Sequence, residues 1–284
     1  MGFWPALLYS LLMNAIPLIE VIVSGRPPAV LILLYWFETV LLVVTGAIRI
    51  VVHRRATGLA GHHAPLNTVS KHDADVDETR RALGDENTYL RGFLGITVIF
   101  TIAHGIFVLA LVFLFKIAGP LSYADVRIAL LYALCVHAIF LLWDLRTLSH
   151  WTFTQLATNV GAASIRVLVT QLGLILGIPV SGMSHSPWGI VGTFVALRAI
   201  ADASLAWLQG FVKRRDLPPG LARFLSKRSK QSVESLEAEF DALKATGKAV
   251  EALLERPFSE VRMTAGTPTL AAVPATATPA RDRR

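Results

Sequence analysis

Long apolar runs separated by shorter polar segments dominate the first three quarters of the chain. Each run is close to the ~20 residues that an α-helix needs to cross the hydrocarbon core of a bilayer. Transmembrane β-strands would be about half as long and would alternate apolar with polar residues. We therefore expect an all-α, polytopic transmembrane helical bundle with about six spans, placed at 3–23, 28–52, 92–116, 126–145, 160–180 and 188–212.

The polar segments predict the direction in which these spans run. The longest connection, 53–91, carries Arg54 and Arg55, and a second basic cluster, Lys213 to Arg215, follows the last span. Cytoplasmic loops carry an excess of lysine and arginine. An even number of expected spans separates the two basic segments, so both fit the cytoplasm. We predict a multipass protein of the cell inner membrane with a transmembrane domain over 1–212 and both termini cytoplasmic.

The chain turns polar beyond the last run, and its apolar residues then follow a three-four spacing. This spacing places the apolar residues on a single face of a helix. It predicts a cytoplasmic amphipathic helix within 213–263 that lies on the membrane or the bundle, or else a coiled coil that joins copies into a homo-oligomer. The Thr/Ala/Pro-rich stretch 264–284 is expected to be disordered. The spaced residues are Val233, Leu236, Phe240, Leu243, Gly247, Val250 and Leu254.

Composition supports the membrane assignment. Apolar residues make up 54% of the chain and charged residues 17%, with a mean hydropathy of +0.54, a profile typical of membrane proteins. The net charge is +7, but the basic residues cluster where helices would meet the cytoplasm, so we expect a lipid-bilayer partner and no nucleic-acid partner. Cys135 is the only cysteine, which excludes an intrachain disulfide or a cysteine-ligated zinc or iron–sulfur site.

Several polar residues interrupt the apolar runs. An ionisable group at the bilayer centre costs at least ~2.5 kcal/mol, so each needs a partner or a function. If successive spans alternate direction, a 1.5 Å rise per residue brings one polar residue from each span near the midplane. These are Asn14, Glu38, His104, His137, Gln171 and Arg198, and a second layer nearer the cytoplasm contains Arg49, Asp144, Arg166 and Asp202. Our candidates for binding or charge relay are Glu38, His104, His137, Asp144, Arg198 and Asp202.

Arg198 has two candidate counter-ions. Asp202 lies four residues further along the same expected helix and can neutralise it on one face, which is a structural role and the one we favour. Glu38 can instead pair with Arg198 across the bundle, which leaves Asp202 for Arg49 or Arg166. The sequence leaves both pairings open.

His104 and His137 form a candidate metal or haem site. They lie about halfway along neighbouring spans in similar strings, His-Gly-Ile-Phe-Val-Leu and His-Ala-Ile-Phe-Leu-Leu. Two imidazoles at one depth can hold haem or a metal ion, and with Glu38 they make a two-histidine, one-carboxylate set. A lone intramembrane histidine is more often a hydrogen-bonding residue between helices.

Two short strings carry a resemblance to a known family. Leu34-Tyr35-Trp36-Phe37-Glu38 in the second span and His104-Gly105-Ile106-Phe107 in the third resemble the multipass bacterial membrane family termed domain of unknown function 6498. The resemblance covers the membrane region, 3–212. It brings no established activity, cofactor or substrate, and it implies that Glu38 and His104 are the first residues to test.

Three functions are compatible with these patterns. In the first, the intramembrane polar cluster serves ion-coupled transport or small-solute binding. In the second, Glu38, His104 and His137 hold a metal ion or haem in a membrane-embedded enzyme. In the third, buried charges are structural and the C-terminal helix acts as a membrane scaffold or sensor. No catalytic set is complete in the sequence, so whether the chain is an enzyme stays open.

Overall fold

The described part of the chain is helical. The computed structural model describes residues 18–19, 21–66, 79–80, 82–84, 88–114, 121–186, 188–214 and 233–265. Within these residues there is no β-strand, only an isolated antiparallel bridge between Leu59 and Pro257. The first expected span lies outside the description except for helical residues 18–19 and 21–23, and so does the expected disordered tail from 266 onward.

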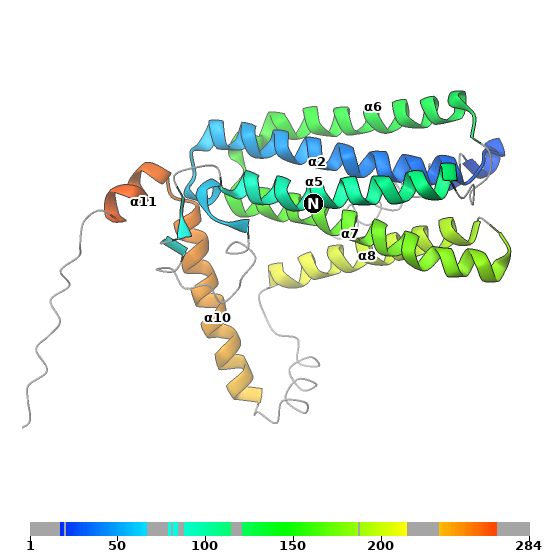
Figure 1. The fold of residues 1–284 in the computed structure, drawn as a ribbon. Helices are drawn as coiled ribbons and strands as arrows, with labels where there is room; N and C mark the ends of the chain where they lie inside the picture. The colour runs from blue at the N-terminus through cyan, green and yellow to red at the C-terminus, as the bar shows by residue number, and fades with distance from the viewer. Residues whose placement is uncertain are drawn as a thin grey trace, which may run out of the picture.

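Long helices occupy the positions of the five later expected spans, and Figure 1 shows them running side by side. Three are long and apolar enough to cross a membrane: Ala29–Thr57, Thr88–Phe113 and Tyr123–His150. This agrees with an all-α membrane protein. The helices are α2 (Ala29–Thr57), α5 (Thr88–Leu109, continued by the π-helical turn η2, Ala110–Leu114), α6 (Tyr123–Thr147), α7 (Phe153–Ser184) and α8 (Trp188–Arg214).

Helix α2 is the centre of this bundle. It packs against α5, α6 and α7, and α7 packs in turn against α8. In an apolar stretch of 18 residues of each helix, the buried share is 56% for α2, 39% for α5 and 11% for α6. Large side chains of the outer helices, such as Ile99, Ile106 and Trp143, are instead exposed. Apolar residues on an outer face are expected where the surrounding solvent is lipid.

Small residues allow α7 and α8 to approach closely. Gly173, Gly177 and Ser181 recur every four residues of α7, so they share one face of the helix. A Cβ atom on Gly177 would lie 2.8 Å from the Cα atom of Ile190. Small residues at this spacing let membrane helices pack backbone to backbone. This packing fixes α8, and with it Arg198, beside the centre of the bundle.

The polar connection after α2 starts later than expected. His53 and Arg54 still belong to α2, which ends at Thr57 because Gly58 adopts a left-handed conformation with φ of 62°. A 3₁₀ turn, η1 (Ala60–His63), follows directly. We call the end of the bundle that carries η1, together with the last turns of α2, α6 and α8 and the first turns of α5 and α7, the η1 end.

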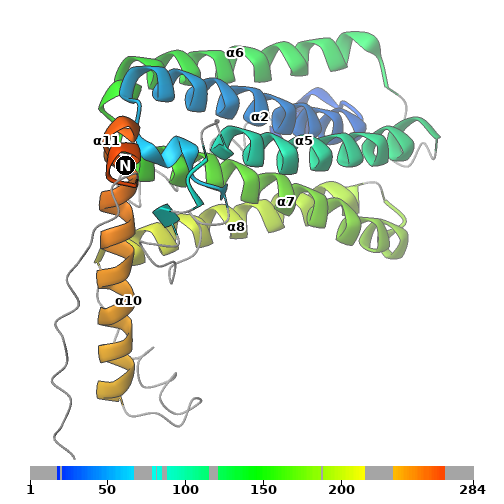
Figure 2. The ribbon, with the colours of Figure 1, turned by 60° about the vertical axis from the view of Figure 1, so that its left-hand side comes forward.

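The C-terminal segment contains two helices rather than one. Helix α10 (Val233–Leu254) and helix α11 (Phe258–Ala265) are separated by a turn at Pro257. Residues 213–214, expected in this segment, belong to α8. Both views show α10 crossing the direction of the bundle helices at the η1 end (Figures 1 and 2).

Candidate functional site

A buried ion pair joins α2 to α8 inside the bundle. The Nη1 atom of Arg198 donates to Oε2 of Glu38 at 2.7 Å, and Nη2 donates to Oε1 at 2.5 Å. The two side chains are only 6% and 12% exposed. The guanidinium also lies over the ring of Tyr35, 5.0 Å from its centroid. Two-pronged arginine–carboxylate pairing combines charge neutralisation with a fixed geometry, so Glu38 reaches across the bundle to neutralise Arg198.

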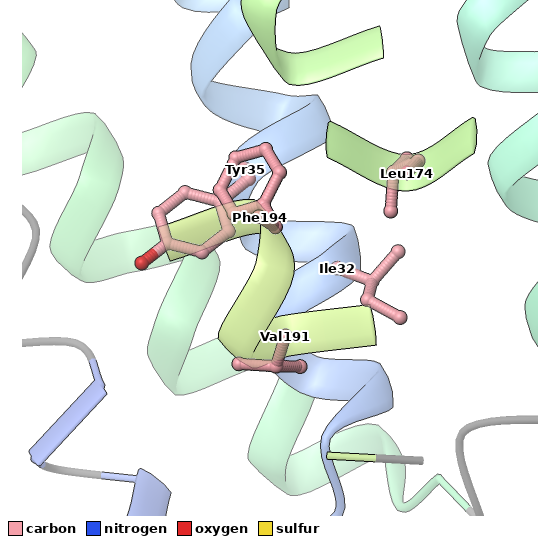
Figure 3. Close-up of a pocket in the computed structure, with 5 residues that line it drawn as sticks. All are labelled: Ile32, Tyr35, Leu174, Val191 and Phe194. Carbon is pink, nitrogen blue, oxygen red and sulfur yellow. The ribbon is translucent and has the colours of Figure 1, made fainter. Parts of the chain in front are cut away.

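The space beside this pair is small and apolar. Figure 3 shows the cavity with the ring of Tyr35 at one edge. Its volume is about 10 Å³, roughly the room that one water molecule requires. The cavity therefore offers no room for a solute. It is lined by Ile32, Tyr35, Leu174, Val191 and Phe194.

His104 lies on α5 and is fully buried. Neither of its ring nitrogens has a hydrogen-bond partner among the described residues, and the hydroxyl of Thr101, one turn earlier, also lacks one. The indole N–H of Trp36 donates to the backbone carbonyl of Thr101 at 3.2 Å. Gly105 permits this approach, because a Cβ atom there would lie 2.7 Å from Nε1 of Trp36. Buried polar groups are normally paired with protein or water. His104 and Thr101 therefore form a small polar site whose side chains can still take up hydrogen bonds.

The structure does not bring Glu38, His104 and His137 together as a ligand set. His137 is half-buried, and its Nδ1 atom is 3.0 Å from the carbonyl oxygen of Ala133 on its own helix. Among the described residues, no three His, Cys, Asp or Glu side chains are grouped as metal ligands would be. The described residues therefore do not form the metal or haem site that the sequence suggested from Glu38, His104 and His137.

The second polar layer contains another ion pair. Oδ2 of Asp144 on α6 accepts from Nε of Arg49 at 2.9 Å and lies 2.7 Å from Nη2 of the same arginine. This pair ties α2 to α6, as the Glu38–Arg198 pair ties α2 to α8. The remaining members of both layers, Asn14 and the side chains of Arg166, Gln171 and Asp202, lie outside the described residues, so the pairing of Arg198 with Asp202 stays a prediction.

A second site lies at the η1 end, where the C-terminal segment docks on the bundle. The backbone N–H of Ala60 donates to the carbonyl of Arg256 at 2.8 Å, and that of Phe258 donates to Gly58 at 3.0 Å. The ring of Phe258 stacks on His63 with centroids 3.6 Å apart. We call this contact between 58–63 and 250–261 the docking seam.

Glu255 ties the docking seam to α7. Its Oε2 atom accepts from the backbone N–H of Phe153, and Oε1 accepts from that of Thr154, both at 2.9 Å. The hydroxyl of Thr154 donates to Oε1 at 3.2 Å. The first N–H groups of a helix lack partners within it and favour a negative charge. Glu255 therefore caps a helix that begins about a hundred residues earlier in the chain.

Two buried histidines connect the docking seam to the bundle. His53 and His62 are both fully buried, and Nδ1 of His53 lies 2.8 Å from Nε2 of His62. The other nitrogen of His53 is 3.0 Å from the carbonyl oxygen of Trp151, which can only accept. One of the two facing nitrogens must donate and the other must accept, so the two imidazoles cannot both be protonated on both nitrogens. Burial, and then the nearby His53, His63 and Arg54, lower the pKa of His62 to about 3.

We predict that acid weakens the docking seam through His62. Its pKa in the folded state lies below the unfolded value near 6.5, so its stabilising contribution is full above pH 6.5 and declines as the pH falls toward 3. The expected decline is about 1.4 kcal/mol per pH unit at most. Amide hydrogen exchange of 250–261 against pH measures it. In His62→Gln, which does not titrate, this part of the pH dependence should vanish; an unchanged pH profile would contradict the assignment to His62.

The sequence offered the bundle as one place for the C-terminal helix to lie, but it did not predict the contacts of the docking seam. A local signal was present, since Thr152 and Gln155 form a capping box at the start of α7. That pattern marks a helix start but does not reveal that Glu255 would complete the cap. The connection depends on residues about a hundred positions apart, for which sequence periodicity carries no information.

The comparisons with known proteins give one match. A model of a family of unknown function, DUF6498, matches residues 1–230, which extends past the membrane region into the basic segment after α8. No curated protein and no solved structure matches the chain. Helices α10 and α11, and with them half of the docking seam, lie beyond the matched residues.

Proposed function

Because this chain belongs to the DUF6498 family, whose function is unknown, we propose a role from its own geometry: it is a membrane scaffold that holds a C-terminal helix rigidly at one face of the bilayer. The docking seam carries this proposal. Backbone pairing on both sides of Pro257, the carboxylate cap by Glu255 and the stacking of Phe258 on His63 all fix the start of α11 and the end of α10. The intramembrane ion pairs then act as ties between helices.

The proposed topology has six spans in the cell inner membrane, with the η1 end in the cytoplasm. Helices α7 and α8 are 32 and 27 residues long, enough to cross a bilayer even though their apolar runs are shorter. Arg54, Arg55 and Arg91 lie at the η1 end and are exposed. By the positive-inside rule this end faces the cytoplasm, which places the docking seam and the C-terminus there.

The test measures whether α10 is held in place. Spin labels at Arg146→Cys and Ala245→Cys, in a Cys135→Ser background, report the distance between α6 and α10 in the full chain in lipid nanodiscs. We expect one narrow distance distribution. A broad distribution in this otherwise wild-type chain would overturn the proposal.

Removing the cap should loosen α10. In Glu255→Ala, hydrogen bonds to a charged acceptor worth about 1.5–3 kcal/mol are lost, so the undocked population should rise roughly ten- to hundred-fold and the distance distribution should broaden. Glu260→Ala is the matched control, because it removes the same charge from an exposed position nearby. An equal broadening in both variants would exclude a specific role for the cap.

A second candidate function rests on His104. Its two ring nitrogens and the hydroxyl of Thr101, all buried and without partners among the described residues, fit a site for a water-sized occupant or a transferred proton, on which ion-coupled transport or small-solute binding would depend. Nitrogen NMR of histidine-labelled protein in lipid, with His104→Leu to assign the signal, should show hydrogen-bonded ring nitrogens at His104. Ring nitrogens without hydrogen bonds would contradict an occupied site.

A further inference from the structure

Helix α10 carries a row of apolar residues that continues beyond the docking seam. Seven residues of 233–254 follow the three-four spacing, and in an α-helix such positions share one face. The C-terminal members of this row, Val250 and Leu254, are buried in the cluster at the η1 end, together with Phe153 and Leu156 of α7. The row continues along the same face toward the N-terminus of α10.

The direction of α10 decides what this row meets. In both views α10 ends at the η1 end, and its N-terminal part extends sideways past α8, across the direction of the bundle helices (Figures 1 and 2). Because the row keeps to one face of the helix, we expect its N-terminal part to be turned toward the membrane, as the docked part is turned toward the bundle. Beside the bundle, at the depth where its helices end, lies the headgroup and acyl boundary of the bilayer.

Charge argues against a second copy as the occupant of this row. Between 233 and 255 six carboxylates stand against two lysines, so two copies of α10 packed along each other would repel. Gly247 also leaves one position of the row without a side chain, which weakens a coiled-coil core. An interfacial helix needs only an apolar face against lipid and a polar face against water.

We propose that the apolar row of α10 N-terminal to Val250 lies on the lipid interface of the membrane, as a continuation of the docking seam. The positions concerned are Val233, Leu236, Phe240 and Leu243. The inference rests on the proposed scaffold role, because the docking seam sets the direction of α10. Since the helix is acidic, burial of apolar area and not attraction to anionic lipids holds it there.

Spin-label accessibility in nanodiscs of phosphatidylcholine tests the proposal in the full chain. In a Cys135→Ser background, one label replaces Leu243 and a matched label replaces Ala245, which lies two residues along and is exposed on the other side of the helix. We expect the label at 243 to show a several-fold higher ratio of oxygen to nickel-chelate accessibility than the label at 245. Anionic lipid should not increase this ratio.

Two outcomes would overturn it. Equal accessibility at both positions means that lipid does not cover the row, and dipolar coupling between labels at 243 of different copies assigns the row to a second copy. The distance from Arg146→Cys to Ala245→Cys separates this result from the scaffold proposal. A narrow distance with equal accessibilities rejects the lipid contact alone, whereas a broad distance rejects the scaffold role itself.

Discussion

Glu38→Met should destabilise the protein more than Arg198→Met, and each should cost about 3–5 kcal/mol, because removing one member of a buried ion pair leaves the other charge without its counter-ion. The order follows from the group left behind. A lone Glu38 carboxylate can take up a proton and become neutral, whereas a lone Arg198 guanidinium stays charged. Unfolding in mixed micelles with increasing dodecyl sulfate measures both changes.

The double variant Glu38→Met/Arg198→Met should be more stable than either single variant, since two apolar side chains of similar length replace two charges. The pair Arg49–Asp144 is the control. Its side chains are 16% and 26% exposed, so charges left there retain more solvent and the matching substitutions should cost less. Equal costs for Glu38→Met and Arg198→Met, with additivity in the double variant, would mean that the two residues do not depend on each other.

Gly61→Ala should disrupt the docking seam. A Cβ atom on Gly61 would overlap the ring of Phe153, which is fully buried and also packs edge-on against His62 and Tyr89. Because the ring is fully buried among these neighbours, we expect a cost from overpacking of about 1–3 kcal/mol. Faster proteolysis between α10 and the bundle, together with a lower unfolding temperature in detergent, would report the effect.

A smaller side chain at position 153 should relieve the destabilisation caused by Gly61→Ala. Gly61→Ala/Phe153→Leu is expected to recover part of the lost stability, because the smaller side chain vacates the space that the new methyl group needs. Gly247→Ala is the control, since nothing lies within 4 Å of a Cβ atom there, and it should be neutral or stabilising by roughly 0.5–1 kcal/mol. If Gly61→Ala leaves the stability as unchanged as Gly247→Ala does, Gly61 is not packed closely against the ring of Phe153.

The sequence by itself determined the helices. Apolar runs of about twenty residues have few alternatives to a helix, so the later runs coincide with α2, α5, α6, α7 and α8 to within several residues. Among the described helices, those at Ala29–Thr57, Thr88–Phe113 and Tyr123–His150 are long and apolar enough to cross a membrane. The same reasoning restricted the counter-ions of Arg198 to two candidates, of which the structure shows Glu38, whereas the side chain of Asp202, the one we favoured, lies outside the described residues. These inferences succeed because hydropathy and helical rise act locally along the chain.

Only the tertiary structure decided which polar groups meet. The helices of His104 and His137 both pack on α2, yet Nδ1 of His137 lies 3.0 Å from a carbonyl oxygen of its own helix. Depth follows from position in a helix, but the direction of a side chain about the helix axis relative to its neighbours depends on packing. The docking seam shows the same limit, because Glu255 reaches the first N–H groups of α7 only after the ends of several helices have been gathered at one end of the bundle.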